Sequence, residues 1–170
     1  MLKNFCHRID LLNEWVGKYS SWLVIPLTSV ISLDVILRYV FNSPTIWAWD
    51  VGVQLLGAIA ILGGGYAFLY GAHIGIDVLV ERLSPRRRTI VEIITYLFFL
   101  FSVGILLWKT TSAAWTSALS REVFHSFFMP PIYPLKIVMA FGIFLLFLQG
   151  LAKFLRLLST ISSSKTGGEA

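Results

Sequence analysis

Residues 89–111 read TIVEIITYLFFLFSVGILLWKTT, an apolar run that holds only two charged side chains, Glu92 and Lys109. At about 1.5 Å per residue, a helix of this length matches the roughly 30 Å hydrocarbon core of a bilayer. Three more runs are long enough to cross it, and they are predicted at residues 20–41, 44–70 and 134–154. The fold class that follows is an all-α integral membrane protein with four transmembrane helices.

The composition supports this class. Of the 170 residues, 56% are hydrophobic and 14% are charged, whereas a soluble domain has roughly 25% charged residues. The chain carries 14 Lys and Arg against 9 Asp and Glu, but these charges cluster between the apolar runs, so nucleic-acid binding is not expected. The single cysteine, Cys6, excludes a disulfide framework and any site that needs several thiolates.

The positively charged residues predict the orientation. Lys and Arg accumulate on the cytoplasmic side of a membrane protein. Both termini and the loop after the second span are therefore expected inside, and the loops after the first and third spans outside. The basic residues that define the inside are Lys3, Arg8, Lys18, Arg82, Arg86, Arg87, Arg88, Lys153, Arg156 and Lys165.

Three regions are predicted along the chain. Residues 1–19 carry apolar side chains at helical spacing and are expected to form an amphipathic helix on the inner leaflet. Residues 20–156 form the four-helix membrane domain, and residues 157–170 are rich in Ser and Gly and are expected to be a disordered cytoplasmic tail. The apolar row of the first region is Phe5, Ile9, Leu12, Val16 and Tyr19.

The second span carries a stripe of small residues, Gly57, Ala60, Gly64, Ala67 and Gly71. Small residues let helix backbones approach closely in lipid, where association rests on van der Waals packing. Two interpretations stay open, packing within this chain's own bundle and docking onto a partner subunit. An unwound substrate site, as in broken-helix transporters, is disfavoured because no other span has a matching break.

Ionisable residues inside the membrane are candidates for function because burying them is costly. Asp34 and Arg38 are spaced i,i+4 and are predicted to pair along their helix, with a salt bridge to a partner as the alternative. Gln149, near the inner end of the fourth span, is expected to hydrogen-bond between helices.

Lys136 follows Pro134 at the start of the fourth span, so it opposes the positive end of a helix dipole. It needs a compensating acid, and Glu122 and Asp50 are the candidates at that level.

The inner loop contains two further candidates. His73 and Asp77 are one turn apart and could bind a proton or a metal, but two ligands make a weak metal site. Arg86, Arg87 and Arg88 are expected to bind anionic lipid headgroups. No metal or cofactor is therefore expected in this chain.

Enzyme signatures are absent from the sequence, which has no His-Glu-x-x-His, no Gly-x-Ser-x-Gly and no phosphate-binding loop. An enzyme is therefore not expected. A self-sufficient four-helix exporter and a membrane anchor of a redox complex remain as alternatives to a transporter subunit. The anchor is disfavoured because all three histidines lie outside the spans.

Several motifs resemble one family. They are RYVFNSPTIWAWD at residues 38–50, GAHIGIDV at 71–78, RLSPR at 82–86, PPIYPLK at 130–136 and LQG at 148–150. Their order and spacing over roughly residues 20 to 155 resemble the small membrane subunit (DctQ type) of tripartite ATP-independent periplasmic (TRAP) transporters. Gly75 departs from the family pattern, where many members have a basic residue. The 130–136 segment looks most like the mannitol, chloroaromatic and 2-oxoacid branch.

The resemblance implies a scaffold in the bacterial inner membrane. In such systems a large permease subunit holds the substrate and sodium sites and moves as an elevator, and a periplasmic binding protein delivers an organic acid. The expected partners are these two proteins and membrane phospholipids, with sodium bound on the large subunit. The candidate partner-interface residues are Asp34, Arg38, Asp50, Gly57, Ala60, Gly64, Ala67, Gly71, His73, Asp77, Glu122, Lys136 and Gln149.

Overall fold

The computed structural model describes residues 2–71 and 85–166, and side chains within 3–71 and 88–159. This part of the chain is helical, with four stretches long and apolar enough to cross a membrane, which confirms the all-α four-span class. The helices are α1 (Leu2–Ser21), α2 (Val24–Tyr39), α3 (Ala48–Leu69), α5 (Pro85–Ser120) and α6 (Tyr133–Thr166).

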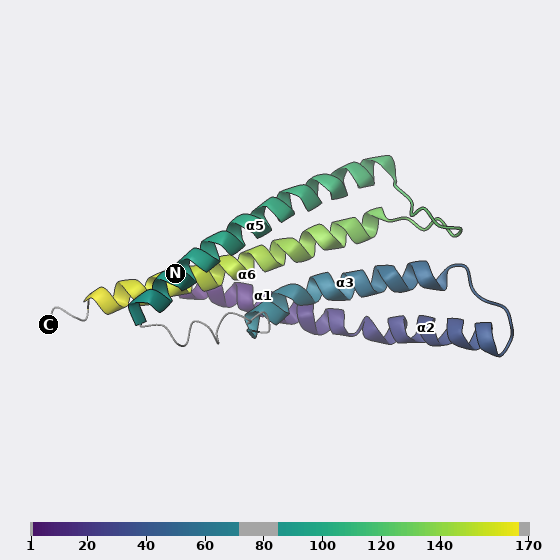
Figure 1. Ribbon diagram of the computed structural model, residues 1–170, viewed down its shortest axis with the longest axis horizontal. Coiled ribbons are helices and arrows are strands. Elements are labelled where there is room, and N and C mark those ends of the chain that lie inside the picture. The colour runs from purple at the N-terminus through teal and green to yellow at the C-terminus, as the bar shows by residue number, and fades with distance from the viewer. Residues whose placement is uncertain (1, 72–84, 167–170) are drawn as a thin grey trace.

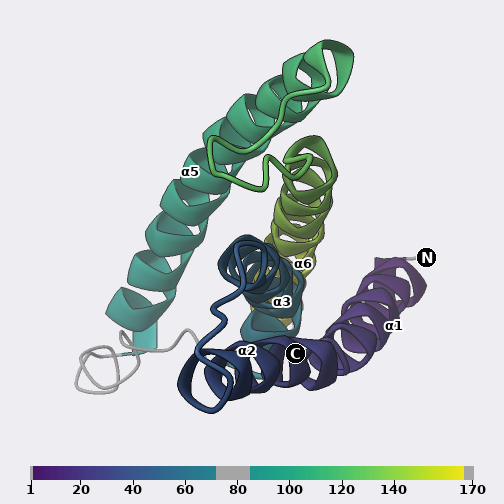
Figure 2. The same ribbon diagram turned by 90° about the vertical axis from the view of Figure 1, so that its right-hand side faces the viewer.

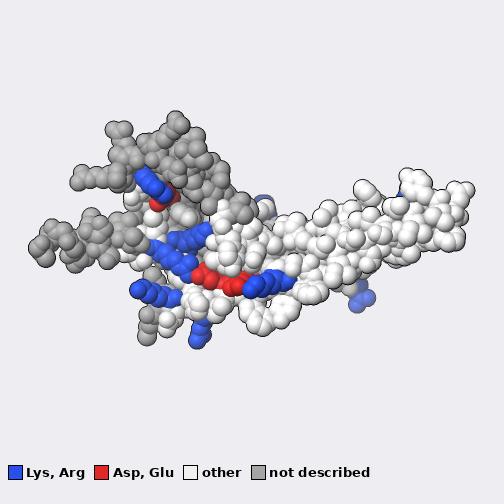
Figure 3. Space-filling view, turned by 90° about the horizontal axis from the view of Figure 1, so that it is seen from below, with Lys and Arg blue, Asp and Glu red and all other residues white. Residues whose placement is uncertain are grey.

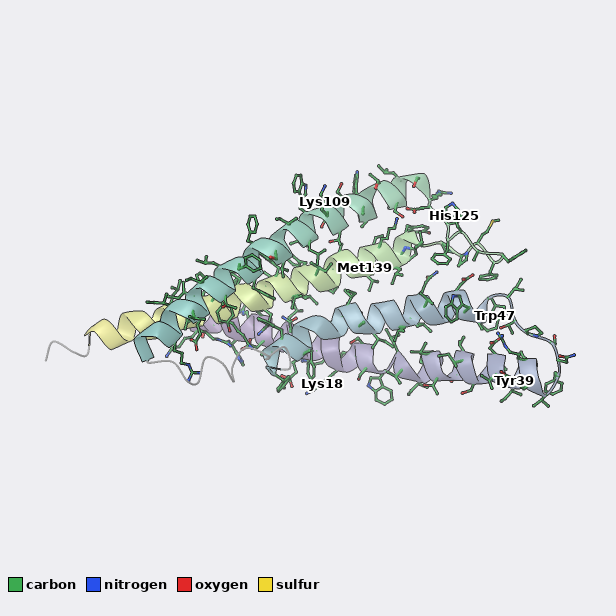
Figure 4. The ribbon with its side chains drawn as sticks, viewed as in Figure 1. Lys18, Tyr39, Trp47, Lys109, His125 and Met139 are labelled. Atoms are coloured by element: carbon green, nitrogen blue, oxygen red, sulfur yellow. The ribbon has the colours of Figure 1, made fainter. Side chains whose placement is uncertain are left out.

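The helices run lengthwise around the packed pair α3 and α6 (Figure 1). Viewed along the long axis, α5 and α2 lie on opposite sides of this pair, and α1 lies beside α3 and α6 (Figure 2). The start of α1, the start of α5 and the end of α6 lie at one end, which we call the inner end, and the connections 40–47 and 121–132 lie at the other, the outer end. Tyr39, Trp47 and His125 mark the outer end in Figure 4. This grouping of helix ends is the one that four consecutive spans require, and the assignment of the inner end to the cytoplasm stays a prediction.

A proline separates α1 from α2. Pro26 has no N–H to donate to the carbonyl of Trp22 four residues earlier. Instead, the N–H of Ile25 donates a hydrogen bond to that carbonyl at 3.1 Å. Two non-helical residues separate Ser21 from Val24. The first span therefore begins close to its predicted start but as a second helix bent away from α1.

The second span begins four residues later than predicted and ends within one residue of its predicted end. It begins at Ala48 and not at Pro44, because the residues after α2 form an irregular connection that contains this proline. It ends where Gly71 adopts a left-handed φ of 77° and its N–H bonds the carbonyl of Phe68 at 3.3 Å. Gly71 therefore terminates the helix, and its predicted contact with a partner stays a prediction.

The two long helices extend past their predicted spans. At about 1.5 Å per residue, the 36 residues of α5 and the 34 of α6 exceed the hydrocarbon core by several turns. The predicted disordered tail at 157–170 is wrong through Thr166, where α6 continues. The sequence has no helix-breaking glycine or proline between Gly150 and Gly167, and leucines continue at 155, 157 and 158.

Large apolar side chains cover most of the outside of the bundle, as expected of a surface that faces lipid. Charged side chains on the face shown in Figure 3 gather over the inner end, and the remaining length of that face is almost entirely uncharged. The most buried apolar positions lie on α1 and α6, where Cys6, Ile9 and Ala152 form one cluster.

Candidate functional site

A polar junction ties α1 to α6 near the inner end. The fully buried Gln149 side chain accepts a hydrogen bond from Asn13 Nδ2 at 2.8 Å and donates one to Asp10 Oδ1 at 2.8 Å. The second oxygen of Asp10 accepts a hydrogen bond from Arg156. We call Asp10, Asn13, Gln149 and Arg156 the inner junction. Gln149 is thus an interhelical hydrogen-bonding residue, as its position indicated.

Glycines allow α1 to pack closely against α3. A Cβ added at Gly65 of α3 would lie 2.0 Å from Asn13 Oδ1, and one added at Gly17 would lie 2.4 Å from Tyr66 Cβ. Asn13 Oδ1 is buried beside Gly65 and has no hydrogen-bond partner within the described residues. The α1–α3 contact therefore depends on the absence of a side chain at both glycines.

The face that α1 buries is not its apolar row. Of the predicted membrane-facing residues, Phe5, Leu12 and Tyr19 are exposed but Ile9 is buried. A small and polar face packs against the bundle, and an apolar flank is left open. The buried positions of α1 are Cys6, Ile9, Asn13, Gly17 and Ser20. Helix α1 is therefore a packed part of the bundle.

Lys153 joins α6 to the inner end of α3. Its Nζ donates to the carbonyl of Phe68 at 2.5 Å and lies 4.6 Å from the centre of the Phe68 ring. A cation at the carboxyl end of a helix complements the helix dipole. The Phe68 ring also stacks on Phe99 of α5 with 4.7 Å between centroids, so three helices meet here.

The outer end has its own polar contacts. Arg38 and Asp34 form the predicted pair along α2, at 2.8 Å. Asp34 Oδ1 accepts hydrogen bonds from the N–H of Thr45, at 3.1 Å, and from the Thr45 hydroxyl. Asp34 therefore holds both the arginine and the connection between α2 and α3.

The two acids proposed as partners of Lys136 make different contacts. Lys136 Nζ pairs with Glu122 Oε2 at 2.5 Å. The lysine donates to this carboxylate and holds the pKa of Glu122 below its ordinary value. Asp50 is buried in the first turn of α3 and accepts a hydrogen bond from Ser126. It therefore ties α3 to the connection 121–132.

The small-residue stripe does not form a continuous contact within the described chain. Gly57 meets Leu135 of α6, where an added Cβ would lie 3.6 Å from Leu135 Cδ1. Around Gly64, by contrast, nothing described lies within 4 Å of an added Cβ. One close contact of α3 with α6 is at Gly142 of α6, where an added Cβ would lie 2.5 Å from Ile61. Among the described residues, packing within this bundle therefore does not account for Gly64.

Several other candidate residues are either outside the described part of the chain or exposed on its surface. His73 and Asp77 lie outside the described residues, as do the side chains of Arg86 and Arg87. Arg88 pairs with Glu92 at 2.9 Å. Ala60, which shares the open side of α3 with Gly64, is exposed.

Sequence reasoning missed the residues that make the longest-range contacts. A signal was present in α1, where Asp10 and Asn13 interrupt apolar residues at the i,i+3 spacing of one helix face. Their partners could not be read from the sequence. The missed residues are Asp10, Asn13, Gly17, Thr45, Gly65, Ser126, Gly142, Lys153 and Arg156.

The fold and these contacts define a multi-pass membrane protein whose polar side chains mainly hold its own helices together. The comparison with known proteins gives the family. Residues 27–160 match the model of the tripartite ATP-independent periplasmic transporters, DctQ component, so the chain belongs to this family. It is a transporter component of the inner membrane and not an enzyme.

The curated relatives are distant and are matched in part. A Haemophilus influenzae protein provisionally named TRAP transporter small permease is 29% identical over 100 residues, which cover 56% of this chain and 62% of the relative. The sialic acid TRAP transporter permease SiaT of the same species is 29% identical over 98 residues, covering 55% of this chain and 15% of SiaT. The C4-dicarboxylate TRAP small permease DctQ of Vibrio cholerae is 28% identical over 82 residues, covering 48% and 35%. The match thus spans less than two thirds of each relative.

Proposed function

We propose that this chain is the small permease subunit of a TRAP-type secondary transporter. It serves as a fixed scaffold that anchors a large elevator-type permease subunit. The whole transporter takes up an organic acid that a periplasmic binding protein delivers, coupled to sodium. Two of the relatives carry the small-permease name, which supports this assignment. SiaT supports the partnership, because a segment similar to this chain makes up 15% of a longer permease protein.

The observation that carries the proposal is the open side of α3 around Ala60, Gly63 and Gly64. An added Cβ at Gly63 or Gly64 meets nothing within 4 Å in the described chain. In lipid, helices pack most closely where small residues expose the backbone. We propose that a helix of the large permease docks on this side of α3, which we call the α3 open face.

The contacts within the chain are those expected of a rigid scaffold. The inner junction, the Lys153–Phe68 contact and the Asp50–Ser126 contact each bind two segments of the chain together. These polar groups are therefore used for packing within the subunit. We place the substrate and sodium sites on the large permease, and we expect no cofactor in this chain.

The test is reconstitution with and without the partners. The chain is coexpressed with a TRAP large permease and a periplasmic binding protein of the same organism, purified in mild detergent and placed in proteoliposomes. We expect copurification with the permease, and sodium-driven uptake only when all three proteins are present. Transport by this chain alone would instead support an exporter, and a visible absorbance spectrum would support a redox anchor.

A further inference from the structure

A cleft of about 540 Å³ runs between α2 and α3 toward the outer end. Its walls are apolar along most of its length and include Leu27, Gly52 and Leu56. Arg38 and Trp49 line it nearer the outer end. This volume lies within the roughly 300–1,000 Å³ range of small-molecule sites in proteins.

The cleft exists because α2 and α3 pack loosely. No residue of α2 is buried, and its main contacts are with α3. At Gly52 the backbone forms part of the wall, and an added Cβ would still lie 3.9 Å from Leu27. The packing thus leaves an elongated apolar space that is open to the membrane.

One end of the cleft carries a positioned cation. Arg38 donates through one terminal nitrogen to Asp34 Oδ2, and its side chain remains 51% exposed. Both oxygens of Asp34 already accept hydrogen bonds, from Arg38 on one side and from Thr45 on the other. A guanidinium has five N–H donors, so Arg38 keeps further donors for an anionic group.

The dimensions match one leaflet of a bilayer. Leu27 and Arg38 are eleven residues apart on one helix, a rise of about 16 Å at 1.5 Å per residue. Half of a roughly 30 Å hydrocarbon core is about 15 Å. Tyr39 and Trp49 are 80% and 77% exposed beside Arg38, at the level where such side chains meet lipid glycerol and headgroups.

We propose that this cleft binds one phospholipid of the outer leaflet. Its phosphate lies on the Arg38 guanidinium, and one acyl chain runs inward along Leu27 and Leu56. Asp34 is a positioning residue, because it holds the guanidinium without occupying all of its donors. The bound lipid completes the contact between α2 and α3. This inference rests on the membrane location alone and not on the transport function.

The test uses photoactivatable lipids on the intact chain with its copurified partners in polymer discs. One probe is phosphatidylglycerol with a diazirine in the acyl chain, and the other is diacylglycerol with the same chain and no phosphate. We expect phosphatidylglycerol to label residues 27–35 and 49–56 well above the exposed side of α5. Labelling of the two regions at equal levels would overturn the proposal.

Two substitutions test the headgroup contact and the acyl-chain contact separately. Arg38→Gln should lower phosphatidylglycerol labelling about tenfold, as expected for losing hydrogen bonds to a charged group, and leave diacylglycerol labelling unchanged. Gly52→Leu should lower both by filling the cleft. Arg121→Gln removes an exposed cation elsewhere at the outer end and should change neither, and Arg38→Lys should retain part of the phosphatidylglycerol signal.

Two further results would contradict the proposal. Unchanged phosphatidylglycerol labelling in a folded Arg38→Gln variant would remove the headgroup site. Crosslinks from residues 27–35 to a permease peptide, together with loss of lipid labelling in the complex, would assign the cleft to the protein partner. The thermal unfolding of each variant is compared with that of the wild type, and Arg38→Lys provides a folded variant if Arg38→Gln unfolds.

Discussion

Asn13 of α1 donates a hydrogen bond to the side-chain oxygen of Gln149 of α6 across 2.8 Å, although 136 positions separate the two residues. Both side chains are almost completely buried. Removing either partner leaves a buried polar group without its hydrogen bond, whereas removing both leaves a smaller penalty. The pair therefore fixes how α1 crosses the bundle.

We expect Asn13→Leu and Gln149→Leu each to destabilise the chain by about 1–3 kcal/mol, the cost of an unsatisfied buried group. The double variant should lose less than the sum of the two single losses because the residues are in contact. Thermal unfolding in detergent measures this effect, with Ser29→Ala on the exposed side of α2 as the control. Strict additivity would show that the hydrogen bond is not what couples α1 to α6.

Two neighbouring glycines of α3 should respond in opposite ways to the same small change. Gly65→Ala places a Cβ 2.0 Å from Asn13 Oδ1, so we expect a loss of about 1–3 kcal/mol from overpacking. Gly64→Ala meets nothing within 4 Å, so we expect no loss and a gain of up to about 1 kcal/mol from helix propensity. The comparison of their melting temperatures tests the packing directly. Equal melting temperatures would contradict it.

A larger change at the α3 open face should affect the partner and not the chain itself. We expect Gly64→Leu to reduce copurification with the large permease at least several-fold, because a leucine prevents close backbone packing. Its melting temperature as an isolated chain should remain close to that of the wild type, since the site is open. Ala113→Leu on the exposed side of α5 is the matched control. Normal copurification of Gly64→Leu would remove this face from the proposed interface.

Acid should weaken the contact between Glu122 and Lys136. The lysine lowers the pKa of Glu122 below its ordinary value of 4.5, so the folded chain binds this proton less readily than the unfolded chain does. The pair therefore stabilises the fold above pH 4.5, and this contribution disappears as the pH falls through the lowered pKa. We expect the melting temperatures of the wild type and Glu122→Gln to differ at neutral pH and to converge in acid. A pH-independent difference would contradict this.

The orientation can be tested with cysteine labelling because Cys6 is the only native cysteine and is buried. An impermeant maleimide should label Thr45→Cys and His125→Cys in intact spheroplasts. It should label Ser159→Cys only after the membrane is permeabilised. Wild-type Cys6 should stay unlabelled unless the chain is denatured. Labelling of Ser159→Cys from outside would reverse the predicted topology.

The sequence by itself determined the features that depend on local spacing and on the bilayer. Four apolar runs of sufficient length predicted four spans, because a helix must be about 20 residues long to cross the hydrocarbon core. The Asp34–Arg38 pair was predictable because i,i+4 residues share a helix face. The partner of Lys136 could be narrowed to two acids because both were expected at the level where its helix starts. The structure was needed to identify Glu122 as the partner.

Only the tertiary structure decided which face of α1 is buried and which glycines are in contact. The apolar row through Phe5 and Leu12 was predicted to face the membrane, but the sequence did not show that the face through Asn13 and Gly17 packs against the bundle. In a membrane, lipid accepts apolar side chains as readily as protein does, so hydrophobic periodicity does not identify the face that packs. The packing face is identified by close helix contacts and by hydrogen bonds. Both depend on where the crossing of α1, α3 and α6 places Gly65 and Gln149.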